Sequence, residues 1–200
     1  MSERPPAIAT QANRTARVRS VETAWFEAPD ARRQARGRRV ARDLVELSRL
    51  QRGDERAQQA QVDLAVFLRQ ICAGYGQLSI AGPDSLVVSS DPRRLARVLS
   101  ALLDNAALHG KPPIAVRYDT SEIVIEDSGG GFEPKLLERA TEPFVTGSRA
   151  RGRGIGLGLA IAARQAALLG ADLRLNNGPT GGASARLCFR ARADAPQPGA

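Results

Sequence analysis

The sequence has little of several residue types that mark particular classes of protein. Aromatic residues make up 4% of its 200 residues, histidine occurs once and cysteine twice. Cys72 and Cys188 lie far apart, and neither has a partner at the spacing of a metal or redox site. A disulfide scaffold is therefore excluded, and we expect both cysteines to be small, buried apolar residues.

Long apolar stretches are missing too. No segment approaches the roughly 20 uninterrupted apolar residues of a membrane span, and the N-terminal residues lack the apolar core of a signal peptide. We therefore expect a cytoplasmic protein that does not insert into a membrane. The apolar content of 42% and the charged content of 25% suffice for one globular domain of ordinary size with additional segments.

Lysine is scarce in a chain that is nevertheless basic. Lys111 and Lys135 are the only lysines, so 27 of the 29 basic residues are arginines, and against 21 acidic residues they give a net charge of +8. Residues 1–60 hold 13 arginines and 8 acidic residues, which places most of the excess near the N-terminus. Because the sequence has no DNA-binding motif and no basic stripe interleaved with aromatic residues, we expect no nucleic-acid partner.

Hydrophobic periodicity divides the chain into four parts. Residues 1–37 form an N-terminal segment without a sustained period, expected to be partly disordered, and residues 192–200 form a tail expected to be disordered. Within residues 38–61, apolar residues recur at helical spacing and predict an amphipathic helix whose apolar stripe has no partner. Residues 38–52 are therefore a candidate docking or dimerisation surface.

The fourth part, residues 62–191, mixes helices with short strands. Helices are expected over 63–71, 91–109, 134–140 and 156–169, and strands over 78–80, 86–88, 114–118, 123–126, 173–175 and 183–189. The first two strands are expected to flank a turn at residues 82–84 and to pair as a hairpin. Asp91 and Pro92 mark a helix start, because Asp caps free amide groups and Pro fits the first turn. Helices interleaved with strand pairs that are mostly hairpins predict an α+β fold, a two-layer sandwich of a mixed sheet and helices.

A polar cluster lies on the expected helix at 91–109. The opposite face of this helix is apolar, so Asp104, Asn105 and His109 share the other side, with Asn105 and His109 one turn apart. The uncharged oxygen of asparagine suits Mg²⁺, which binds few protein oxygens together with phosphate. A solvated polar face is the alternative interpretation.

Two glycine-rich blocks follow. Asp127 ends a strand and precedes three consecutive glycines, which let the backbone approach a ligand closely and exceed what a hairpin turn requires. Gly154, Gly156 and Gly158 alternate at the start of a helix, where free amide groups form a phosphate site. This second block follows no strand of a βαβ unit, and no phosphate loop with a Gly-Lys-Ser/Thr ending is present. A flexible loop before a helix is the alternative for it.

In order and spacing, these blocks resemble the nucleotide-binding blocks of the GHKL ATPase superfamily, and most of all those of sensor histidine kinases. The resemblance covers about residues 38–190 and includes Phe144 and the final Gly181-Gly182. It implies a Bergerat-type fold of roughly five strands and three helices, with ATP between the helices and a mobile lid. The helix within residues 38–61 resembles the second helix of the kinases' dimerisation hairpin.

The resemblance also assigns roles toward two cofactors, ATP and Mg²⁺. Asp127 would bond the adenine amino group, Asn105 would bind Mg²⁺, and Phe144 would anchor the lid. Asp104 is a further catalytic candidate, for polarising the phosphoryl acceptor. Arginines of the lid, Arg149, Arg151 and Arg153, would offset phosphate charge. The implied nucleotide-binding set is Asn105, His109, Asp127, Gly129, Gly131, Phe132, Phe144, Arg149, Gly154, Gly156, Gly158 and Leu159.

The chain departs from the family pattern at three points. Ala101 replaces a usual Asn, and Leu108 replaces a frequent basic residue; each loss is comparable to one charge-assisted hydrogen bond, roughly 1.5–3 kcal/mol. The third departure is that the single histidine, His109, falls in the implied ATP site, so residues 1–37 offer no phosphoacceptor.

These features predict the catalytic subunit of a split two-component histidine kinase, which transfers the ATP γ-phosphoryl group to a histidine on a separate protein. A response regulator would then receive the phosphate. One alternative is a catalytically degenerate ATP-binding or dimerising regulator of another histidine kinase. Another is a stand-alone serine kinase of the anti-sigma-factor type, and an acceptor motif encoded upstream of Met1 would restore a conventional kinase.

Overall fold

The computed structural model describes residues 37–38, 40–50, 58–147, 155–179 and 181–190. The chain divides into two compact units, residues 1–42 and 43–200. The described residues of the first unit are helical, and residues 43–50 of the second are helical as well. None of the helices in these described ranges is long and apolar enough to span a bilayer.

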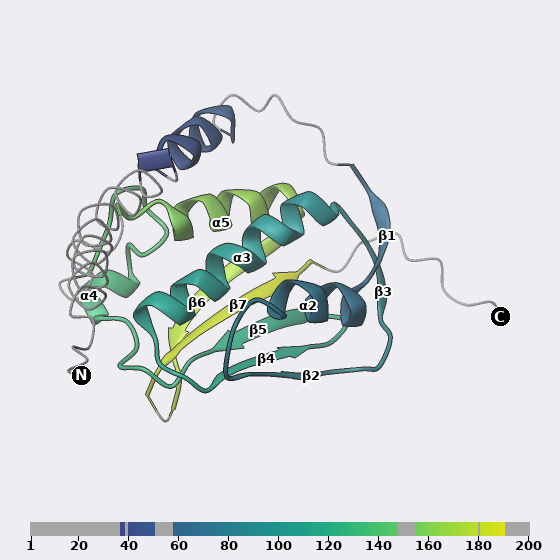
Figure 1. Cartoon of the computed structure of the whole chain (residues 1–200). Helices are drawn as coiled ribbons and strands as arrows, with labels where there is room; N and C mark the ends of the chain where they lie inside the picture. Colours follow the sequence, from purple (N-terminus) through teal and green to yellow (C-terminus); the bar gives the residue numbers. More distant parts are fainter. Residues whose placement is uncertain (1–36, 39, 51–57, 148–154, 180, 191–200) are drawn as a thin grey trace, which may run out of the picture. The chain divides into compact units, whose positions relative to one another are not determined.

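A five-stranded mixed sheet is the base of the second unit. Its strand order is β2 (Leu78–Ala81), β4 (Ile114–Tyr118), β5 (Glu122–Glu126), β7 (Ala183–Phe189) and β6 (Ala171–Asn177). The β2–β4 pair is parallel and the other three pairs are antiparallel. One face is covered by α2 (Leu64–Cys72), α3 (Pro92–His109) and α5 (Gly158–Leu168), as Figure 1 shows. The predicted α+β two-layer sandwich is confirmed.

Strand alternation separates the core from an open face of the sheet. Ile123 and Ile125 belong to the core that packs against the helices. Val124 points the other way and is still only 5% exposed. It pairs with Arg117 on β4 and Arg186 on β7, whose side chains lie on the same face of the sheet as its own. Arg117 forms an ion pair with Glu126 at 2.7 Å, and Arg186 forms one with Glu122 at 3.2 Å, so this face carries charged pairs.

The helix α3 starts where the sequence predicts. The Asp91 carboxylate accepts hydrogen bonds from the amides of Arg93 and Arg94, and Pro92 occupies the first turn. The Asp91 carboxylate also accepts from the amide of Gln58 at 2.8 Å, which ties the preceding segment to the helix. The predicted apolar face is buried, namely Leu95, Val98, Leu99, Leu102, Leu103 and Ala106.

One expected strand pair is wrong. The strands near 78–80 and 86–88 do not form a hairpin, because β2 joins the main sheet and β3 (Val87–Ser90) pairs with β1 (Ala60–Asp63) in a separate two-stranded sheet. Leu78 and Ile80 complete the apolar face of the main sheet, which a hairpin with β3 would not allow. The strand β1 itself was not expected from the sequence.

The expected unpartnered stripe on the N-terminal helix needs a partial correction. Leu47 and Leu50 pack in a small cluster with residues of the glycine-rich block and α5, whereas Leu44 and Val45 are 41% and 52% exposed. Only Leu44 and Val45 leave apolar surface available in the helix 43–50.

The other predicted elements are present, and most of their boundaries lie within two residues of the predicted ones. The helix expected over 134–140 is shorter, α4 (Pro134–Leu137).

Candidate functional site

A buried carboxylate at the end of β5 is the centre of the candidate site. Asp127 is 8% exposed, and its backbone amide is held by the carbonyl of Ala183 at 3.0 Å. One carboxylate oxygen, Oδ1, accepts the amide of Gly129 at 2.7 Å. Among the described residues no other donor reaches this carboxylate, so its remaining oxygen is available to a ligand.

Three glycines surround Asp127 so closely that none tolerates a side chain. A Cβ atom at Gly110 would collide with the Asp127 side chain, one at Gly129 would lie 2.8 Å from Oδ1, and one at Gly182 would strike the Asp127 carbonyl oxygen. Gly182 also has a φ of 78°, which favours glycine. Because Gly110 follows directly on α3, these contacts bring the C-terminal end of α3 to Asp127.

The loop after Asp127 is fastened at both ends. The Ser128 amide donates to the Lys111 carbonyl at 2.9 Å. At the other end, the Phe132 amide donates to Asn177 Oδ1 at 2.7 Å, and Asn177 Nδ2 donates to the Phe132 carbonyl at 2.9 Å. Gly131, with a φ of 67°, passes against Asn177. The predicted residues Gly129, Gly131 and Phe132 are thus held in one loop beside the carboxylate.

The polar side of α3 carries the remaining predicted residues of that helix. Asn105 is partly buried and His109 is exposed, one turn further on. No side chain in the described part of the chain hydrogen-bonds Asn105. Asp104 differs, because its carboxylate accepts the Tyr75 hydroxyl at 2.8 Å. This contact ties α3 to the loop after α2 and competes with the predicted role of Asp104 at the phosphoryl acceptor.

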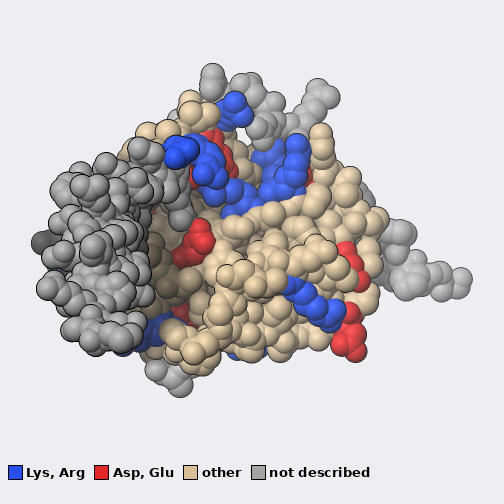
Figure 2. Space-filling view, in the orientation of Figure 1, with Lys and Arg blue, Asp and Glu red and all other residues tan. Residues whose placement is uncertain are grey.

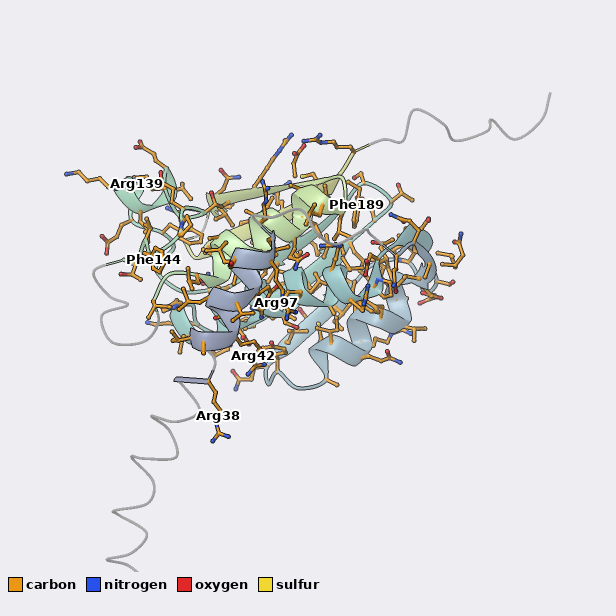
Figure 3. The ribbon with its side chains drawn as sticks, turned by 90° about the horizontal axis from the view of Figure 1, so that it is seen from above. Arg38, Arg42, Arg97, Arg139, Phe144 and Phe189 are labelled. Atoms are coloured by element: carbon orange, nitrogen blue, oxygen red, sulfur yellow. The ribbon has the colours of Figure 1, made fainter. Side chains whose placement is uncertain are left out.

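A second group of predicted residues meets at the start of α5. The Phe144 amide donates to the Gly156 carbonyl at 2.9 Å, and both residues have positive φ angles, 64° and 74°. Phe144 is 62% exposed and lies at the end of the domain where Figure 3 also labels Arg139.

The helix α5 begins at Gly158 without a side-chain cap, so the first amides of the helix are available to an anion. The next residue, Leu159, packs on the core. Arg149, Arg151, Arg153 and Gly154 lie outside the described residues.

Sequence reasoning missed three residues that the structure places at this site. Gly110, Asn177 and Tyr75 contact Asp127, Phe132 and Asp104 respectively. A glycine directly after a helix ordinarily reads as a helix end, and Asn177 before Gly178 reads as a hairpin turn. Neither pattern indicates which distant segment the residue will contact.

The residues present fit Mg²⁺ only together with a phosphate ligand. Within the described ranges, no group of three or more His, Cys, Asp or Glu side chains could hold a metal ion. Mg²⁺ keeps several waters and commonly takes one or two protein oxygens plus phosphate. The amide oxygen of Asn105, to which no side chain in the described ranges hydrogen-bonds, suits that arrangement, and an all-protein cage is not required.

Comparison with known proteins places this chain in a family. The model of the histidine kinase-, DNA gyrase B- and HSP90-like ATPases matches residues 90–193, more than half of the chain, and the chain belongs to this family. Within it, the chain is a histidine kinase catalytic domain of the GHKL type, as its relatives and structural neighbours indicate.

The relatives are bacterial sensor kinases. The chain is 41% identical over 142 residues to the sensor protein CseC of Streptomyces avermitilis, covering 70% of this chain and 29% of that protein. It is 44% identical over 112 residues to the sensor histidine kinase component HK1 of Mycobacterium tuberculosis, covering 54% of this chain and 66% of that protein. The chain thus spans less than a third of the length of CseC.

Solved structures of the same kind share the fold. The histidine kinase domain of the Escherichia coli osmosensor EnvZ has a TM-score of 0.53 at 27% identity, covering 74% of this chain and 98% of that one. The ATP-binding domain of PrrB from Mycobacterium tuberculosis has a TM-score of 0.52 at 24% identity, covering 68% and 98%. Both agree with the mixed sheet and helical layer of the present structure.

Proposed function

We propose that this chain is the ATP-binding catalytic part of a histidine kinase and transfers the γ-phosphoryl group of ATP to a histidine on a separate protein. The observation that carries the proposal is the buried Asp127 carboxylate, framed by glycines and reached by the end of α3. A buried carboxylate with a free acceptor oxygen is suited to an exocyclic amino group such as that of adenine. The glycines leave room for a flat base against the backbone.

The phosphates would extend from the base toward Asn105 and the start of α5. Mg²⁺, when bound through Asn105, neutralises phosphate charge. The first amides of α5 have no capping side chain and are therefore available to an anionic phosphate. Because phosphoryl transfer depends mainly on positioning and charge stabilisation, these groups supply what the nucleotide side of the reaction needs.

The acceptor is proposed to lie on another protein because the sequence contains one histidine. That residue, His109, sits at the end of α3 beside Gly110, whose backbone touches Asp127. A residue in this position is suited to nucleotide contact rather than to receiving the phosphate. The relative HK1 is described in its name as a component, which is consistent with a kinase divided between chains. A response regulator is proposed as the next recipient.

The test combines nucleotide binding with transfer. Asp127→Ala should weaken Mg-ATP binding by about 10- to 100-fold, because it removes one hydrogen bond to a charged acceptor. Calorimetry measures this, with Asp84→Ala, a change at an exposed turn, as the matched control. Labelled ATP together with proteins that carry an acceptor histidine should then give acid-labile phosphate on the partner.

A second candidate function is favoured by the residues at two positions of α3. Ala101 is 6% exposed and belongs to the core, so this position offers no polar atom to the nucleotide, and Leu108 is 43% exposed where a basic residue is frequent in the family. A regulator that binds ATP without transferring phosphate would show Mg-ATP binding but no labelled partner. Absence of binding in the parent chain would contradict both functions.

A further inference from the structure

One face of the helix formed by residues 43–50 is occupied by the nucleotide domain. Arg97 on α3 donates to Glu46 at 2.7 Å and to Asp43 at 2.6 Å. Gln165 on α5 donates to the same Glu46 at 3.0 Å and accepts from Arg94 at 2.8 Å. Figure 3 labels Arg97 beside this helix, and Figure 2 shows basic and acidic side chains side by side above α3 and α5.

Apolar contacts continue this interface into the glycine-rich block. Leu50 is 4% exposed and forms a cluster with Leu157, at 1%, and Ile161, at 0%. Leu47 and Ile155 pack at the edge of the same cluster. Leu157 stands between Gly156 and Gly158, at the residue that precedes α5. A residue of the N-terminal helix is therefore in the same small core as the phosphate-binding segment.

We propose that the face formed by α3 and α5 is a binding site for the chain's own residues 43–50, and that occupancy of this site supports nucleotide binding. The inference rests on the proposed function, because it concerns the same ATP site. Removing the helix would expose Leu157 and Ile161 to water, and the segment around Gly156 would lose the contacts that order it. Nucleotide and helix then favour each other's binding, since coupling between two sites is reciprocal.

Residues 43–50 match the face formed by α3 and α5 in both charge and apolar contact. Its two acidic residues, Asp43 and Glu46, face a guanidinium, and its Leu50 faces the apolar start of α5. Leu44 and Val45, which point elsewhere, are the exposed apolar residues of the segment. Since i, i+3 and i+7 positions share one side of a helix, residues 43, 46 and 50 present the docked side together.

The experiment uses the full chain and two pairs of matched variants. Leu50→Ser is compared with Val45→Ser on the exposed side of the same helix, and Arg97→Gln with Arg69→Gln, at an exposed position of α2. Mg-ATP affinity is measured by calorimetry, and hydrogen exchange is followed for the amides of residues 157–161 and of β5. Leu50→Ser and Arg97→Gln should weaken ATP binding by about fivefold or more and speed exchange at residues 157–161, with β5 still protected.

The outcomes separate the coupling from the function itself. Both control variants should behave as the parent does. Binding by the parent with unchanged affinity in Leu50→Ser and Arg97→Gln overturns the coupling alone, whereas no binding by the parent overturns the proposed function and the coupling with it. Protection at residues 157–161 that rises with protein concentration would assign the site to the helix of a second copy and overturn the intramolecular assignment.

Discussion

Asn105 is the residue whose role is most sharply defined by what surrounds it. Its neighbour Asp104 is engaged by Tyr75, while no side chain among the described residues hydrogen-bonds the Asn105 amide. A polar group held on a helix without a protein partner is available to a ligand, and its oxygen suits Mg²⁺ with phosphate. The proposed metal dependence of nucleotide binding therefore rests on this one side chain.

The prediction is that Asn105→Ala weakens ATP binding only when Mg²⁺ is present. Loss of one metal ligand should lower the affinity for Mg-ATP by about tenfold or more, while binding measured with a chelator should stay as in the parent. Asn176→Ala, at an exposed position of β6, is the matched control. An equal loss with and without Mg²⁺ would show that Asn105 contacts the nucleotide directly or supports the fold.

Residues in continuous motifs were the predictable part of the site. The Asp127 block and the glycines before α5 are recognisable because each motif has its own local order and spacing. Gly110 and Asn177 were not predictable, since their importance arises from contacts with segments 17 and 45 positions away along the chain, at Asp127 and Phe132. Such contacts are properties of the folded sheet and helices, and no local pattern encodes them.

Among the elements, α3 links the core to the site, and Asp91 begins it. The Asp91 side chain is 0% exposed and accepts three backbone amides. Burial raises its pKa, but the amides of Gln58, Arg94 and Arg93 and the charge of Arg93 outweigh this, so the net pKa is lowered. A carboxyl with a lowered pKa in the folded state stabilises the fold above its unfolded pKa, near 4, and loses that contribution as the pH falls.

Asp91→Ala should therefore destabilise the domain at neutral pH by about 2 kcal/mol or more, because a cap is lost and buried amides are left unpaired. The free energy of unfolding, measured with urea at pH 7 and at pH 3, should differ less between the two pH values in the variant than in the parent. Asp84→Ala, at an exposed turn, should match the parent at both. Identical pH dependence in parent and Asp91→Ala would contradict the assignment.

Elements with strong local signals were predicted, and those defined by pairing were not. The helix α3 has a cap, a first-turn proline and a long apolar face, all readable in order. The four-residue strand β1 exists because it pairs with β3, with Val62 opposite Val88, and such a short segment carries too little alternation to be recognised. The same limit explains the misassigned hairpin, since β2 and β3 are adjacent in sequence but pair with different strands.

The main sheet has one face covered by helices and one open, charged face. The stability of the whole molecule depends on pH at low pH through Asp91 and at high pH through a buried cysteine. Cys72, on the helical side, is 4% exposed in the core, as the sequence predicted, whereas Cys188 on β7 is only half-buried, so the prediction that both cysteines are buried is wrong for Cys188. Burial raises the pKa of the Cys72 thiol from about 9, the value of an exposed cysteine, to about 11. Between these values the unfolded chain loses a proton that the folded chain keeps, so rising pH favours unfolding.

The free energy of unfolding should accordingly fall as the pH rises above about 9, by roughly 1 kcal/mol at pH 10 from this thiol. Urea unfolding at pH 7 and pH 10 measures the change in a Cys188→Ala background, which removes the half-buried thiol of β7. Adding Cys72→Ala lowers stability at both pH values through lost packing, but it should flatten the change between them. If the change from pH 7 to pH 10 is the same with and without Cys72, the thiol is ionising in the folded state, and the core around α2 admits water that its burial excludes.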